Sequence, residues 1–276
     1  MINKMTDRQK KILIAAGAAG AAYALLSVGM LGAFAGIGPM KGLQKMRMER
    51  KPGNSDEFSA DRAEKLDHSP LEGKNIVFLG SSVTYGAHSL GESFVEFLAK
   101  RNGFTYVKEA VSGTTLATKY GRNYVDRMRE NIDVNEKFDM FVCQLSTNDA
   151  TRKVPLGAVS DSFSILDFDT DTVAGAIEYI AAYVKGTWGC PLVFYTGTKY
   201  GSERYADMVK LLFELKEKWG FEVIDLWNDE VRNSVSDEQY AFYMSDPIHP
   251  TRAGYRDWWA PIMERELYRI AEEKKE

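Results

Sequence analysis

The stretch NIVFLGSSVTYG, residues 75–86, joins an apolar run to a turn made of small residues. Residues 76–79 are β-branched, aromatic or aliphatic, which is typical of a strand buried on both faces. The turn Gly80-Ser81-Ser82 follows at once, and Phe94 and Phe97 then lie on one face of a helical pattern. A serine at such a strand-to-helix turn can expose its hydroxyl above the sheet.

Apolar runs of the same kind recur along the chain and alternate with stretches of helical period. The runs predicted as strands are 75–79, 105–111, 139–145, 191–196 and 222–226. This alternation predicts a single three-layer α/β domain with a five-stranded parallel sheet in the flavodoxin-like strand order. Ligands bind such sheets at the carboxyl ends of the strands, so functional residues should lie just after strands.

The first forty residues have a different composition. No charged residue occurs from Ile12 to Met40, a run long enough to cross a bilayer as a helix. We expect residues 1–40 to form an uncleaved single-pass signal anchor, residues 41–73 a polar juxtamembrane linker, and residues 74–276 the catalytic domain outside the membrane. The alternative is a secreted protein, because Ala33-Phe34-Ala35 resembles a signal-peptide cleavage site. Basic residues flank the run on both sides, so the charge balance leaves the opposite orientation open.

Composition excludes several classes of function. The net charge is -4, so nothing in the sequence suggests binding to nucleic acid. The chain has two cysteines, Cys143 and Cys190, and no Cys/His spacing typical of zinc. We expect both cysteines to be inert core residues, and we expect neither metal nor cofactor. The oligomeric state is left open.

A carboxylate and an imidazole stand three residues apart in Asp246-Pro247-Ile248-His249-Pro250, ahead of a C-terminal helical stretch. A serine hydroxyl is a weak nucleophile until a base takes its proton, and the base works best when a carboxylate fixes its tautomer. We therefore predict Ser82 as nucleophile with His249 and Asp246 as its catalytic partners. His88 is expected to face solvent or to cap the turn.

Two further strand ends offer hydrogen-bond donors. Gly113 follows the second predicted strand, where a glycine lets a backbone N–H approach a ligand closely. Asn148 follows the third strand and carries a neutral amide donor. These residues predict an oxyanion hole, although an asparagine at this place is also an ordinary turn former.

The order Gly80-Ser81-Ser82, Gly113, Asn148 and Asp246-Pro247-Ile248-His249 resembles the four blocks of the SGNH/GDSL hydrolase superfamily, from about Lys74 to the end. The resemblance implies a metal-free Ser-His-Asp esterase with an oxyanion hole formed by the Ser82 and Gly113 backbone N–H groups and the Asn148 amide. Ser81 departs from the pattern, because the family usually has aspartate there.

Two other segments of the sequence carry weaker signals of function. Carboxylates alternate in Asp167-Phe168-Asp169-Thr170-Asp171, and Glu178 occupies the twelfth place of a calcium loop begun at Asp167. The sixth place holds Thr172 instead of glycine, so helix capping is the favoured interpretation. The long connection 150–169 leaves the functional edge of the sheet and is predicted to shape the substrate site.

The sequence thus predicts a membrane-anchored serine esterase that acts on short acyl esters, with O-acetyl groups on carbohydrate as the expected substrate class. One alternative keeps the same residues in an O-acyltransferase that passes the acyl group to a cell-surface glycan. Another is a non-catalytic carbohydrate-binding protein on the same fold. The expected partners are a small acylated substrate and the membrane, which the N-terminal helix would enter.

Overall fold

The computed structural model describes residues 41–230 and 233–273. The chain divides into two compact units, Met1–Arg47 and Met48–Glu276, and the sheet lies in the second. The predicted membrane segment, residues 1–40, falls outside the described residues. Within the described ranges, no helix combines the length and the apolar character needed to cross a membrane.

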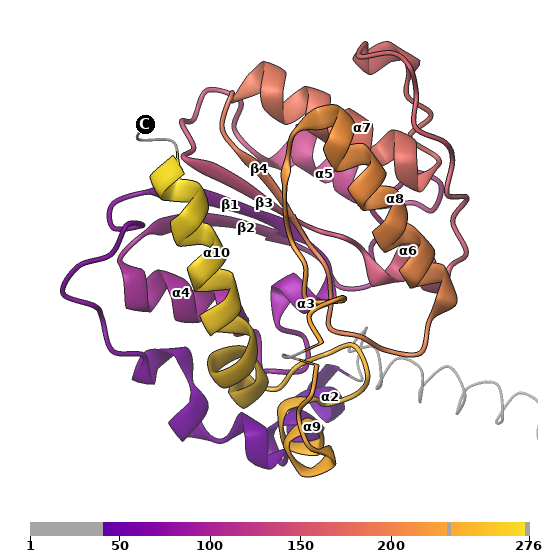
Figure 1. Ribbon diagram of the computed structural model, residues 1–276. Coiled ribbons are helices and arrows are strands. Elements are labelled where there is room, and N and C mark those ends of the chain that lie inside the picture. The colour runs from indigo at the N-terminus through magenta and orange to yellow at the C-terminus, as the bar shows by residue number, and fades with distance from the viewer. Residues whose placement is uncertain (1–40, 231–232, 274–276) are drawn as a thin grey trace, which may run out of the picture. The chain divides into compact units, whose positions relative to one another are not determined.

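The second unit is built around a five-stranded parallel sheet (Figure 1). The strands are β1 (Asn75–Gly80), β2 (Thr105–Ala110), β3 (Met140–Gln144), β4 (Leu192–Tyr195) and β5 (Glu222–Ile224). Their order across the sheet is β2-β1-β3-β4-β5. The predicted fold class, number of strands and flavodoxin-like order are confirmed.

Helices cover both faces of this sheet. The helices that cover it are α4 (Phe94–Asn102), α5 (Tyr124–Asn131), α7 (Val173–Thr187), α8 (Glu203–Trp219) and α10 (Ala260–Glu273). The described residues also form α2 (Lys41–Glu49), α3 (Ser82–Tyr85), α6 (Thr147–Thr151), α9 (Asp237–Tyr243), and 3-10 turns at Pro52–Asn54, Asp56–Phe58, Ala60–Arg62 and Ile165–Asp167. In Figure 1, α4 and α10 lie over one face, and α5, α7 and α8 lie over the other.

The apolar residues of β1 alternate between two cores. Ile76 and Phe78 are buried against α4 and α10, whereas Val77 and Leu79 are buried against α5, α7 and α8. Successive side chains of a strand point to opposite faces, so a run without polar residues fits only a sheet that is covered on both sides. This is the physical reason why residues 75–79 indicated a three-layer fold.

The carboxyl ends of the central strands are level with one another. Gly80 is paired with Ala110 of β2, and Leu79 is paired with Cys143 of β3. The turns that follow β1, β2 and β3 therefore leave the sheet at one edge. They carry Ser82, Gly113 and Asn148, respectively.

Residues 48–73 differ from the predicted linker, because they belong to the same compact unit as the sheet. Met48 and Leu71 are buried, and so is the polar side chain of Asn54. The Asn54 amide donates to the carbonyl oxygens of Met48 and His88, at 3.0 and 2.8 Å. A segment held mainly by polar contacts shows little apolar periodicity, which is why its composition suggested a linker.

The C-terminal helix was predicted from Thr251 to about Lys274. In the structure it contains a π-helical segment, Gly254–Trp259, that continues into α10. Gly254 is required at the start, because a Cβ there would come within 2.1 Å of the Tyr243 carbonyl oxygen. This close contact brings the helix up against the end of α9, directly after the loop that carries His249.

Candidate active site

Ser82 is the first residue of α3, immediately after the turn that leaves β1. The turn is closed by Gln144, whose Oε1 accepts hydrogen bonds from the Ser81 N–H (2.9 Å) and the Thr84 hydroxyl (2.8 Å). Gly80 makes room for this arrangement, because a Cβ there would lie 1.7 Å from Oγ1 of Thr84. The position of Ser82 is therefore determined by the neighbouring strand as well as by its own turn.

Ser82 and His249 meet at this edge of the sheet. The Ser82 Oγ lies 2.8 Å from Nε2 of His249, although the residues are 167 positions apart in the chain. Ser82 is buried, with 8% of its surface exposed. The structure thus brings together the hydroxyl and the imidazole that the sequence singled out.

The loop that carries His249 is shaped by Asp246. Oδ1 of Asp246 accepts hydrogen bonds from the backbone N–H groups of Ile248 and His249, at 2.8 and 2.9 Å. The loop is closed where the Ser245 N–H donates to the His249 carbonyl oxygen (2.8 Å). Hydrogen bonds within the loop therefore fix the Asp246 carboxylate independently of its contacts with the histidine rings.

Asp246 also contacts the His249 ring, because both of its oxygens lie 2.9 Å from Nδ1. Burial raises the pKa of Asp246, but hydrogen bonds from His249 and His88 outweigh it, so the pKa falls below its ordinary value. An ionised Asp246 keeps the proton of neutral His249 on Nδ1. Nε2 is then the acceptor for the Ser82 hydroxyl.

Gly113 and Asn148 lie on two segments that are joined by hydrogen bonds. Gly113 has φ +79°, which favours glycine, and a Cβ there would meet nothing within 4 Å. The Asn148 amide donates to the Thr114 carbonyl oxygen (3.0 Å), and Arg152 donates to the Gly113 carbonyl oxygen (3.0 Å). An amide nitrogen carries two protons, and the bond to Thr114 uses only one of them.

Asp149 was not singled out by the sequence, although it follows Asn148 directly. Its carboxylate is fully buried and accepts hydrogen bonds from the backbone N–H groups of Leu116 (2.7 Å) and Ala117 (3.1 Å). Burial raises the pKa of Asp149 to about 6, against the opposing effect of these bonds. The carboxylate holds the loop after Gly113 in place. The one feature of the sequence that could have indicated Asp149 is its place directly after Asn148, a candidate oxyanion donor.

Arg127 had no signal in the sequence, because a charged residue normally faces solvent. Here the side chain is completely buried. It contacts the end of β1 and the loop after β2, and it forms an ion pair with Glu109 at 2.8 Å. No pattern in the sequence indicated this role.

His88 corrects an expectation, since it neither faces solvent nor acts as a simple cap. It is 6% exposed, and its ring stacks on that of His249 with centroids 4.2 Å apart. Its Nδ1 lies 3.1 Å from Oδ2 of Asp246. The expectation was wrong because a helical pattern cannot place the irregular turn after α3 against a loop more than 150 residues away.

His88, Asp246 and His249 are the described residues whose ligand atoms could hold a metal ion, since these atoms all lie within 4.8 Å of one another. Their arrangement does not favour chelation. The two rings are stacked with an interplanar angle of 28°, and both Nδ1 atoms face the same carboxylate. Ring nitrogens bind metals in the plane of the ring, so two stacked rings are poorly placed to share one ion.

The connection between β3 and α7 packs against α8, which covers the same face of the sheet as α7. Lys218 of α8 donates to the carbonyl oxygens of Ser160 (2.6 Å) and Ser162 (2.5 Å), and the Phe163 ring packs against Trp219 at 5.2 Å. Glu178 is buried in an ion pair with Lys218, so it does not complete a calcium loop with Asp167. A role of this connection in shaping the substrate site stays a prediction.

The three-layer fold, with Ser82, His249 and Asp246 in contact beyond the carboxyl ends of its strands, is the arrangement found in α/β hydrolases. Residues 78–256 match the GDSL-like lipase/acylhydrolase family, and the chain belongs to this family. The resemblance to SGNH/GDSL hydrolases is therefore confirmed, and the protein is an enzyme that hydrolyses esters.

Solved structures share the fold. A protein from Lactobacillus plantarum is 21% identical, with 71% of this chain and 97% of that one covered and a TM-score of 0.59. A Bacteroides ovatus protein assigned as a GDSL-like lipase is 16% identical, with coverages of 72% and 99% and a TM-score of 0.54. An acetyl xylan esterase from Geobacillus stearothermophilus is 14% identical, with coverages of 73% and 97% and a TM-score of 0.52. Among curated proteins, none matches this chain.

Proposed function

We propose that this hydrolase uses Ser82 as nucleophile, His249 as general base and Asp246 as the group that orients His249. The observation that carries the proposal is the 2.8 Å separation of Ser82 Oγ and His249 Nε2. Nδ1 of the same ring lies 2.9 Å from the Asp246 carboxylate, so the ring has one nitrogen for each partner. This is the geometry that activates a serine hydroxyl.

The reaction follows in two stages. As Ser82 Oγ attacks the ester carbonyl carbon, its proton moves to Nε2 of His249, and the carbonyl oxygen becomes an oxyanion. The intermediate collapses with release of the alcohol, which takes the proton from His249, and leaves an acyl group on Ser82. Water, deprotonated by His249, then attacks this acyl group and releases the carboxylic acid and free Ser82.

The oxyanion is held by the backbone N–H groups of Ser82 and Gly113 and by the second proton of the Asn148 amide. Ser82 lies at the first turn of α3, where N–H groups lack partners inside the helix. The bonds from Asn148 to Thr114 and from Arg152 to Gly113 keep the second and third donors in fixed relation to each other. Donors fixed in advance stabilise the transition state without the cost of reorganisation, and each contributes about 100-fold or more in rate.

The proposed substrates are short acyl esters of a polar alcohol, with O-acetylated carbohydrate as the first class to test. The surroundings of Gly113 support a polar substrate, because Arg152 lies over the ring of the half-exposed Tyr120, 5.9 Å from its centroid. An aromatic face beside a guanidinium suits sugar hydroxyls better than a long acyl chain. The fold that this chain shares with an acetyl xylan esterase agrees with this choice.

The sequence also supports a proposal about where the protein is located. The uncharged run from Ile12 to Met40 would anchor the protein in a membrane with its catalytic unit outside. Alkaline carbonate extraction and N-terminal sequencing of the mature protein test this point. A soluble protein that begins after residue 35 would replace the anchor with a cleaved signal peptide.

The test of the catalytic assignment uses the full chain in detergent, with p-nitrophenyl acetate and a fluorophosphonate probe that labels active serines. We expect Ser82→Ala to abolish labelling and to lower turnover at least about 1,000-fold. Ser234→Ala, at an exposed serine of the connection between β5 and α9, serves as the matched control and should leave both unchanged. Undiminished turnover in Ser82→Ala would reject the assignment, and transfer of acetyl to an added xylo-oligosaccharide would favour the acyltransferase.

A further inference from the structure

The Asp246 carboxylate contacts two imidazoles. Besides His249, it faces His88, whose Nδ1 lies 3.1 Å from Oδ2 of Asp246 and 3.2 Å from the Ser245 hydroxyl. An ionised carboxylate can only accept a hydrogen bond, so this approach requires a proton on Nδ1 of His88. Both histidines therefore present Nδ1–H to one carboxylate.

The two rings also touch each other. Their centroids are 4.2 Å apart, and the interplanar angle is 28°. His88 thus lies against the face of His249, whereas Ser82 and Asp246 contact the edges of that ring through its nitrogens. The catalytic ring is limited in rotation from three directions.

Residues of the N-terminal segment hold the turn that carries His88 in place. Asn54 donates to the His88 carbonyl oxygen (2.8 Å), and its own Oδ1 accepts a hydrogen bond from the Arg252 N–H (2.9 Å). One side chain therefore joins the His88 turn to the residues that follow His249. Lys51 fixes the same loop from the other end through a hydrogen bond to the Ser245 carbonyl oxygen (3.0 Å).

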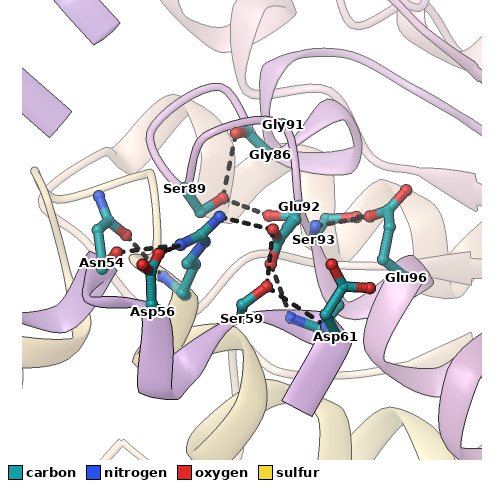
Figure 2. Close-up of polar contacts among 12 residues, drawn as sticks. Asn54, Asp56, Ser59, Asp61, Gly86, Ser89, Gly91, Glu92, Ser93 and Glu96 are labelled. Carbon is teal, nitrogen blue, oxygen red and sulfur yellow. Dashed lines mark hydrogen bonds and ion pairs between the residues drawn. The ribbon is translucent and has the colours of Figure 1, made fainter. Parts of the chain in front are cut away.

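Further polar contacts hold the turn that carries His88, as Figure 2 shows for the labelled residues Ser59, Ser89 and Glu92. Ser89 donates to the Gly86 carbonyl oxygen (3.1 Å), and Glu92 accepts a hydrogen bond from Ser59 (3.1 Å). Glu92 is also paired with Arg252 at 2.6 Å. The turn that carries His88 is therefore fixed by several polar contacts.

We propose that His88 is a positioning residue of the catalytic centre, which shares Asp246 with His249 and thereby adjusts the basicity of His249. The inference rests on the proposed roles of Ser82, His249 and Asp246. A second N–H donor on Asp246 takes up part of the negative charge that would otherwise stabilise a protonated His249. His88 thus keeps His249 unprotonated, and active as a base, to a lower pH than Asp246 alone would allow.

Other charged and titratable groups face this centre. Lys51 and Arg252 contribute positive charge through the segments that hold the loop. The phenol groups of Tyr240 and Tyr255 interact electrostatically with Asp246 and stay neutral, since burial raises the pKa of each. Asp246 is thus the carboxylate that faces both rings. Protonation of either histidine therefore affects the protonation of the other.

Three substitutions separate the contributions of the ring and of the N–H group. His88→Asn keeps a donor for Asp246 without the ring, His88→Phe keeps the ring without a donor, and His88→Ala removes both. His68→Asn, at an exposed histidine of the N-terminal segment, is the matched control. Each full-length variant is assayed for kcat/KM on p-nitrophenyl acetate from about pH 4.5 to 8.5, which extends about half a unit beyond the range in which histidines titrate. Thermal unfolding of each variant is measured as well.

We expect the midpoint of the acid limb to move up by about half to one pH unit in His88→Phe and His88→Ala, because a net hydrogen bond contributes about 1 kcal/mol. His88→Asn should stay near the wild-type midpoint, and His68→Asn should equal it. Plateau kcat should fall about 10-fold in His88→Ala. An unchanged midpoint in both Phe and Ala variants, whatever their thermal stability, would overturn the inference and leave His88 a space-filling residue.

Different experimental results would reject the catalytic assignment and the role proposed for His88. Turnover that survives Ser82→Ala rejects the catalytic assignment, whereas loss of turnover in Ser82→Ala with unchanged His88 variants rejects only the role of His88. NMR titration of the three histidine rings gives a readout that does not depend on activity. A His249 midpoint that does not rise in His88→Ala contradicts the inference even if no ester is turned over.

Discussion

Nη2 of Arg127 donates a hydrogen bond to the carbonyl oxygen of Gly80, 2.8 Å away. The same nitrogen lies 3.1 Å from the Thr114 hydroxyl, and Nη1 is paired with Glu109. One buried cation thus connects the turn that leads to Ser82 with the loop that carries Gly113. The proposed nucleophile and one proposed oxyanion donor are thus held in relation to each other by a side chain of α5.

Replacement of this cation should lower stability strongly. Arg127→Met leaves the Gly80 carbonyl oxygen with only the Val111 N–H as donor (3.2 Å) and Glu109 without the ion pair to Arg127. We expect a loss of about 2 to 4 kcal/mol in the free energy of unfolding. Urea denaturation measures the effect. Arg129→Met, at an exposed position of the same helix, should change stability by less than about 0.5 kcal/mol. Similar values for both variants would contradict the connecting role.

Ser81 replaces the aspartate usual in the family, and Gln144 explains why the serine fits. The Ser81 hydroxyl lies 3.3 Å from Oε1 of Gln144, to which it can donate. In Ser81→Asp a carboxylate would face that oxygen in a fully buried place. We expect a loss of about 1 to 3 kcal/mol in the free energy of unfolding. A variant as stable as the wild type would show that Gln144 can rearrange to accept an acid.

Gly113 can be tested for conformation alone, because a Cβ at this place would meet no atom within 4 Å. Gly113→Ala forces an L-residue to adopt φ +79°, at a cost of about 1 to 2 kcal/mol. If the chain relaxes, its N–H turns away from the oxyanion, and kcat should fall about 10-fold or more with little change in KM. Gly186→Ala, at an exposed helical glycine with equal room, should be neutral or slightly stabilising. Full activity in Gly113→Ala would remove Gly113 from the oxyanion hole.

Asp149 predicts a particular pH dependence of stability. Its pKa is raised to about 6 in the folded protein, so between about pH 4 and pH 6 the folded state binds more protons at this residue than the unfolded state does. Its contribution to stability is therefore larger at pH 4 than at pH 7, by about 2 to 3 kcal/mol. The unfolding free energy of wild type minus that of Asp149→Asn should decrease as pH rises from 4 to 7. A difference that increases over this interval would reverse the sign of the assigned shift.

The fold could be predicted because its signals are local. The central strands are mostly apolar, as in residues 76–79, and the long covering helices repeat their buried residues with helical period. The place where the candidate site residues come together could be predicted for a related reason. Ser82, Gly113 and Asn148 all follow predicted strands, and parallel strands end at one edge.

The remaining features depend on contacts between irregular segments, which leave no periodic signal. Asn54, His88 and Arg127 act through hydrogen bonds to the backbone or to side chains distant in sequence. Nothing in their neighbours distinguishes them from ordinary polar residues of loops or helices. Only the folded chain shows that the segment from Met48 onward supports the catalytic loop.

That support has a consequence for proteolysis. Asn54 and Lys51 reach the His88 turn and the His249 loop from a segment that joins β1 through the polar stretch 63–74. A protease that cleaved within this stretch would separate the catalytic body from two of the side chains that brace it. Shedding at that point would free an enzyme with a loosened centre, whereas a cut ahead of Met48 would leave the brace intact.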